Sequence, residues 1–170
     1  MVKSYLFNRF IVLSIFFPLL LLGGCYSFTG GAIPPHLKSM FILPIEDNSG
    51  YGYPKYRNEA NEKLLEVFRN DNSFTLANFG GDAKLEVVIT NIKDETVAVQ
   101  GSELESERRL TITVKANYYD NVLEKEIMSK SFSKYQNYDI SNPQINRDAA
   151  ASVVIEQLCN DILIAVVSGW

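Results

Sequence analysis

The chain has 170 residues, of which 46% are hydrophobic and 21% are charged, and its formal net charge at pH 7 is −4. This length and apolar fraction suit one ordinary domain with a sizeable core. An acidic chain with scattered lysines is a poor general binder of nucleic acid, so we expect no nucleic-acid partner.

The first 24 residues have the layout of a secretory signal. Lys3 and Arg9 supply positive charge, residues 10–22 form an apolar run, and small residues follow up to Gly24. The apolar run is shorter than the about 20 residues that cross a bilayer, which favours a cleaved signal over a permanent membrane anchor. Cleavage between Gly24 and Cys25 would change the net charge of the chain from −4 to −6, because it removes both basic residues.

Cys25 directly follows Leu22-Gly23-Gly24, and this arrangement resembles the lipobox of bacterial lipoproteins. In proteins of that kind the thiol takes a diacylglycerol, the signal is cut before the cysteine, and the new amino terminus is acylated. Several acyl chains anchor a protein stably, whereas one chain binds only marginally. We therefore expect a covalent lipid on Cys25 and no other cofactor. The alternative, a buried or disulfide-bonded Cys25, would leave the apolar run unexplained.

The first half of the expected mature chain contains a tether, a strand and a helix. Residues 25–38 are rich in glycine and proline and indicate an irregular tether, so the expected folded domain is residues 39–170. Residues 39–45 form an apolar run typical of a buried strand, and residues 46–54 have the composition of a loop. Apolar residues at helical spacing predict a helix over residues 55–73.

The middle of the chain predicts strands. Residues 73–78 are compatible with a short strand. Residues 84–100 alternate around the charged residues 93–95, which predicts one long strand with a bulge or two strands in line. A polar connection (residues 101–107) precedes residues 108–120. In this segment apolar and polar residues alternate most cleanly, which predicts a strand with one buried and one solvent-exposed face. The solvent-exposed face is the expected partner face; its residues are Thr111, Thr113, Lys115, Asn117 and Tyr119.

The last part of the chain predicts a weaker strand over residues 127–135 and then a long helix from Asn142-Pro143. Charged residues such as Arg147 and Asp161 argue against a membrane span in this helix. Cys159 lies in its apolar pattern and is expected to be a buried free thiol. The order of elements predicts an α+β fold, with two helices packed on one face of a four- to five-stranded, mostly antiparallel sheet.

Residues with catalytic potential are sparse. His36 is the only histidine, has no cysteine near it, and is not expected to act as a metal ligand or a base. No nucleophile elbow, phosphate loop or Cys-x-x-Cys occurs. Two groups leave alternatives open, because three glutamates could bind a cation or form a solvated hairpin tip, and three tyrosines could stack on a ligand or on one another. These residues are Glu103, Glu105 and Glu107, and Tyr51, Tyr53 and Tyr56. We expect no catalytic residues, no metal site and no enzyme activity.

Several stretches together resemble a known family. They are "GCYSFTGGAIPPHLKSMFILPIEDNSGYG", "AVQGSELESERRLTITVKA", "YQNYDIS" and "DILIAVVSGW", and they are similar to lipopolysaccharide-assembly lipoproteins of the LptE type in the form found in Bacteroidota. The resemblance implies a two-helix, four-stranded sandwich anchored by its lipid in the inner leaflet of the outer membrane, at the periplasmic face. It also implies a role as the plug of a large β-barrel, LptD, with which the protein inserts lipopolysaccharide into the outer leaflet.

The resemblance further suggests a contact with lipopolysaccharide, because members of the family are credited with touching it through basic residues near a strand-connecting loop. Arg108 and Arg109 follow such a loop here and could pair with phosphates, although ordinary cross-strand ion pairing is an equally good interpretation. Two rival functions remain: a periplasmic lipoprotein that regulates cell-wall synthases or another secretion complex, and an uncharacterised hydrolase.

Overall fold

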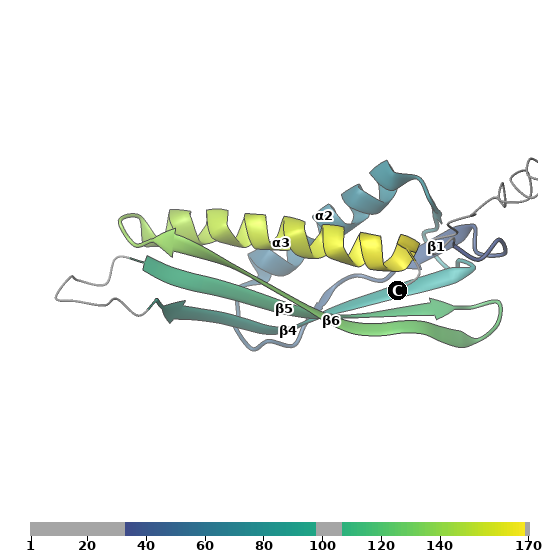
Figure 1. Ribbon diagram of the computed structural model, residues 1–170, viewed down its shortest axis with the longest axis horizontal. Helices are drawn as coiled ribbons and strands as arrows, with labels where there is room; N and C mark the ends of the chain where they lie inside the picture. Colours follow the sequence, from purple (N-terminus) through teal and green to yellow (C-terminus); the bar gives the residue numbers. More distant parts are fainter. Residues whose placement is uncertain (1–32, 98–106, 169–170) are drawn as a thin grey trace, which may run out of the picture. The chain divides into compact units, whose positions relative to one another are not determined.

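The computed structural model describes residues 33–97 and 107–168. Its elements in chain order are β1 (Ser39–Ile42), β2 (Glu46–Asp47), α2 (Pro54–Asp71), β3 (Thr75–Leu76), β4 (Ala83–Thr96), β5 (Glu107–Asp120), β6 (Lys125–Asp139) and α3 (Pro143–Ser168). Figure 1 shows both helices on the same side of the sheet. This arrangement confirms the α+β class and the packing of two helices on one sheet face.

The sheet differs from the expected one in size and in strand direction. Its order is β3-β1-β4-β5-β6, with β2 paired to β4, so it has six strands rather than four or five. The pairs β1/β3, β1/β4 and β2/β4 are parallel, and only β4/β5 and β5/β6 are antiparallel. The sheet is therefore mixed rather than mostly antiparallel. Helix α2 lies between β2 and β3 in the chain and returns it to the starting edge of the sheet, so β3 and β4 run parallel to β1.

The core lies between the two helices and the strands β4 and β5. Alternate residues of β5, from Leu110 to Tyr118, are buried on the helix side, as the sequence predicts. Helix α2 contributes residues such as Leu64 and Phe68, and α3 buries its whole predicted stripe, including Val154 and Ile162. Cys159 is confirmed as a buried free thiol in this core.

Helix α3 combines a long apolar composition with a buried position. By length and composition alone it is sufficiently apolar to cross a membrane, but half of its most apolar window is buried inside the protein. Its helical spacing places nine buried residues on the side that faces the sheet and α2. In the structure the apolar stripe of α3 therefore belongs to the core.

Strand β4 contains a bulge that changes which of its residues face the helices. Before the bulge the odd-numbered residues are buried, among them Val87 and Ile89, whereas after it Ile92 is buried. The pairing with β5 shifts between Ile89 and Asn91, which leaves one extra residue on the β4 side. One long strand with a bulge is confirmed, although the bulge precedes the charged residues 93–95 where the sequence suggested an interruption.

Candidate functional site

The sheet face turned away from the helices is the first candidate for a functional surface. The five predicted partner-face residues of β5 alternate with its buried residues, so they lie together on this outer face. Lys115 is exposed, and the other four (Thr111, Thr113, Asn117 and Tyr119) are half-buried between their neighbours on β4 and β6.

Cross-strand contacts order this outer face. Thr113 Oγ1 lies 3.0 Å from Ser133 Oγ on β6. Asn117 joins both neighbouring strands, because its Nδ2 donates to Glu86 on β4 and its Oδ1 accepts from Ser129 on β6 at 2.8 Å. Contacts of this kind between directly opposite residues are what stabilise a sheet surface. The outer face is therefore a polar surface with fixed side-chain positions.

Charges of both signs are mixed on the outer face. The Lys93 Nζ atom lies 2.6 Å from the Glu95 carboxylate, and the Lys84 ammonium lies 4.5 Å from the centre of the Tyr119 ring. Lys115 lies between Val88 and Ser131 in the pairing of the strands. Such a mixed surface suits a polar protein wall better than a uniformly charged polymer.

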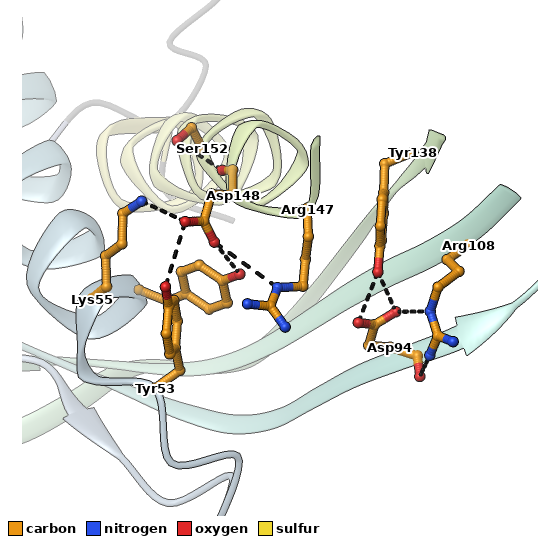
Figure 2. Close-up of polar contacts among 9 residues, drawn as sticks. Tyr53, Lys55, Asp94, Arg108, Tyr138, Arg147, Asp148 and Ser152 are labelled. Atoms are coloured by element: carbon orange, nitrogen blue, oxygen red, sulfur yellow. Dashed lines mark hydrogen bonds and ion pairs between the residues drawn. The ribbon is translucent and has the colours of Figure 1, made fainter. Parts of the chain in front are cut away.

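The structure places the two arginines of β5 on opposite faces of the sheet, because neighbouring residues of a strand alternate. Arg108 lies on the helix side, where its Nε donates to Asp94 Oδ1 at 2.9 Å and one terminal nitrogen donates to the Asp94 carbonyl oxygen (Figure 2). The hydroxyl of Tyr138 donates to the same carboxylate at 2.8 Å. This cluster joins β4, β5 and β6, so Arg108 makes the cross-strand ion pair that the sequence left open.

Asp94 helps to raise the pKa values of both Tyr138 and Arg108. Burial, followed by its hydrogen bond to Asp94, raises the pKa of Tyr138 to about 12. The hydrogen bond to the Asp94 carboxylate likewise raises the pKa of Arg108 above its ordinary value. The tyrosine therefore stays a hydrogen-bond donor, and the arginine stays charged, throughout the physiological range.

Arg109 lies on the outer face near the same end of the sheet. Its Nε donates to Asn137 Oδ1 at 3.0 Å, and its guanidinium lies 4.3 Å from the centre of the Tyr135 ring. Tyr135 is 57% exposed, so this arginine and its aromatic neighbour form part of the accessible surface. The two arginines cannot act as one phosphate clamp, but Arg109 lies on the same side of the sheet as the five predicted partner-face residues.

A second polar cluster, which the sequence did not reveal, links α2 to α3. Asp148 of α3 accepts a hydrogen bond from Lys55 Nζ at 2.8 Å (Figure 2). It accepts another from the Tyr56 hydroxyl at 2.9 Å. Burial raises the pKa of Asp148, but the hydrogen bonds from these two residues outweigh that effect and leave the pKa below its ordinary value. The rings of Tyr51 and Tyr53 pack on Tyr56, which favours a loop that packs on its own aromatic residues.

Other predicted site residues have no place in such a cluster. Gly24, Cys25, Glu103 and Glu105 lie outside the described residues, and Glu107 is an exposed residue at the start of β5. Within residues 33–97 and 107–168, no three His, Cys, Asp or Glu side chains come together in a way that could hold a metal ion.

Comparisons with known proteins agree with this architecture. Residues 37–166 match the family model described as "LptE: Lipopolysaccharide-assembly". None of the curated proteins matches the sequence significantly. Similar solved structures include an uncharacterised lipoprotein B from Nitrosomonas europaea (TM-score 0.58, 13% identity, 86% of this chain and 91% of that one covered). They also include the rare lipoprotein B from Shewanella oneidensis (TM-score 0.55, 13% identity, 77% and 95% covered). A third is a minor lipoprotein from Acinetobacter baumannii (TM-score 0.53, 13% identity, 78% and 94% covered). At these identities the structures show a shared fold.

Proposed function

The chain belongs to the LptE family of lipopolysaccharide-assembly proteins, and on this premise we propose that it is an acylated outer-membrane lipoprotein that plugs a large β-barrel of LptD type and assists the assembly of that barrel. The pair would insert lipopolysaccharide into the outer leaflet. A lipid on Cys25 would hold the protein at the periplasmic face of the outer membrane.

The observation that carries this proposal is the family match over residues 37–166, which covers nearly all of the folded domain. The outer face of the sheet supports it physically, because the interior of a large membrane barrel is polar and a plug needs a polar surface that meets it. The outer face provides polar side chains in fixed positions. A plug also needs no catalytic residues, which agrees with the composition of the chain.

The barrel partnership is tested by co-purification from detergent-solubilised outer membranes. We expect the wild-type protein to bring down an LptD-type barrel and the Lys115→Glu variant to bring down much less, because Lys115 is exposed on the outer face. Lys130→Glu is the matched control. Lys130 is also exposed, but it pairs with Ala116 and therefore lies on the opposite face of the sheet from Lys115. Recovery of a cell-wall synthase instead of a barrel would contradict the proposal.

The lipid anchor is tested by mass spectrometry of the mature protein. We expect a chain that begins at Cys25 and carries acyl chains, and we expect Cys25→Ala to stay unprocessed and to leave the outer-membrane fraction. A mature product that starts at another residue, or that lacks acyl chains, would contradict the anchor.

For the glycolipid contact we propose Arg109 rather than Arg108 as the residue that meets lipopolysaccharide phosphates. Arg109 lies on the accessible face beside Tyr135, whereas Arg108 is held by Asp94 on the helix side. Arg109→Ala should weaken lipopolysaccharide binding and leave the thermal midpoint nearly unchanged, whereas Arg108→Ala should lower the midpoint. Equal loss of binding in two equally stable variants would refute this division.

A further inference from the structure

The turn between β5 and β6 exposes apolar side chains in a place where turns normally carry polar or small residues. Val122 is 55% exposed and Leu123 is 64% exposed. Glycine, proline, asparagine, aspartate and serine dominate turns for conformational reasons, and neither valine nor leucine shares those reasons. Apolar residues at turn positions, where they bring no conformational advantage, point to a functional role.

The turn is held in a fixed conformation. Asp120, which is only 4% exposed, accepts hydrogen bonds at its Oδ1 from the backbone nitrogens of Val122 at 2.9 Å and Leu123 at 2.8 Å. Glu124 closes the turn with a left-handed backbone, φ 51°. The two apolar side chains are therefore presented by an ordered turn, so their contact with a partner requires little additional ordering.

The same turn is bonded to the segment where the described chain begins. The other Asp120 oxygen, Oδ2, lies 2.6 Å from His36 Nε2. Asp82 accepts hydrogen bonds from the backbone of Lys38 and Ser39, and its carbonyl accepts one from Asn121 of the turn. Figure 1 shows the β5–β6 turn at the same end of the sheet as β1.

Chain length connects this end of the fold to a lipid surface. The chain from Cys25 to His36 spans at most about 40 Å when fully extended. Acyl chains on Cys25 would therefore keep His36, and the turn bonded to it through Asp120, within that distance of the bilayer.

A neighbouring loop exposes another large apolar side chain. Phe79, at 88%, is the most exposed large apolar residue of the described part of the chain, and it lies in the loop before β4. The side chain of Asn121 donates to the Gly81 carbonyl of that loop, so the loop and the turn are joined directly.

We propose that the β5–β6 turn is a lipid-contacting tip, in which Val122 and Leu123 enter the boundary between the headgroups and acyl chains of the leaflet that holds the lipid on Cys25. This inference rests on the acylation given under the proposed function. Glu124 and Lys125 carry opposite charges beside the tip, so contact depends on apolar area rather than on anionic lipid, and a change of salt concentration should alter it little.

The single tryptophan of the chain, Trp170, permits a direct test. Leu123→Trp is introduced into a Trp170→Phe background, and the acylated protein is reconstituted into phosphatidylethanolamine–phosphatidylglycerol vesicles with brominated acyl chains. Tyr135→Trp in the same background is the control, because Tyr135 is similarly exposed but lies about 35 Å along β6 from the turn. We expect bromine to reduce the emission of the tip tryptophan at least twofold and to leave that of the control nearly unchanged.

The outcomes separate the tip from the proposed function. Equal, weak quenching at both positions in a protein whose acylation is confirmed by mass would overturn the tip and leave the anchor standing. A protein without acyl chains would overturn the anchor and the tip together. Blue-shifted emission at the tip without bromine quenching would show that a second copy or another protein covers the turn, which would also overturn the lipid contact.

Discussion

Replacing Val154 by aspartate tests the packing of α3 on the sheet. The Val154 side chain is fully buried, so its removal forfeits about 1.5–3 kcal/mol of apolar burial. The new carboxyl would have to lose its charge, and protonating a group with an ordinary pKa near 3.9 costs about 4 kcal/mol at pH 7. The total of about 6 kcal/mol is comparable to the whole free energy of unfolding of a domain, about 5–15 kcal/mol.

Val153 provides the matched control for this substitution. It precedes Val154 in α3 but is 42% exposed, so Val153→Asp should change the free energy of unfolding by less than about 1 kcal/mol. Urea denaturation followed by circular dichroism measures both variants. The penalty in Val154→Asp should decrease as the pH falls from 7 towards 4, because protonation of the unfolded chain then removes the charge term. A Val154→Asp protein with the wild-type midpoint, or two equally destabilised variants, would refute the placement of α3.

The other predictions concern a thiol, a carboxylate and a glycine. Burial raises the pKa of Cys159 to about 12, so in an acylated chain it should resist a thiol reagent at pH 8 and react only after unfolding in urea. Asp148→Asn should lower the free energy of unfolding by about 1–3 kcal/mol at pH 7. Because the pKa of Asp148 is lowered in the folded state, this difference should be complete above the ordinary pKa of 3.8 and shrink as the pH falls below it, as acid titration of both proteins would show. Gly81→Ala would place a Cβ 2.9 Å from the Phe41 backbone nitrogen, and calorimetry should show a loss of about 1–3 kcal/mol.

The regular parts of the fold were predictable because their apolar residues recur at the spacing of a strand or of a helix. Alternation over residues 108–120 predicts β5, and the helical stripe that includes Val154 and Ile162 predicts α3. The parallel pairing was not predictable, since β2 and β3 have only two residues each and show no period. Strand direction depends on how the chain returns after α2, which is a property of the whole topology.

The candidate site was predictable only where it follows from alternation. The outer-face residues of β5 were identified because every second residue of that strand is polar. The contact of Asp94 with Tyr138 joins residues 44 positions apart, and that of His36 with Asp120 joins residues 84 positions apart. No local pattern marks such pairs, because each partner is an ordinary polar residue in its own segment. The register of the strands brings Asp94 to Tyr138, and the path of the chain before β1 brings His36 to Asp120.

The bulge in β4 constrains how this gene can change in length. It reverses the odd–even phase of the strand, which places Ile92 under the helices and brings Asp94 to the side where Arg108 and Tyr138 meet it. Deleting Thr90, the extra residue, would restore regular pairing and leave these directions unchanged, whereas deleting Lys93 would turn Asp94 outward and Glu95 inward. Descendants of this sequence should therefore lose a codon at the bulge, or in a connecting segment, far more readily than one between the bulge and the end of this strand.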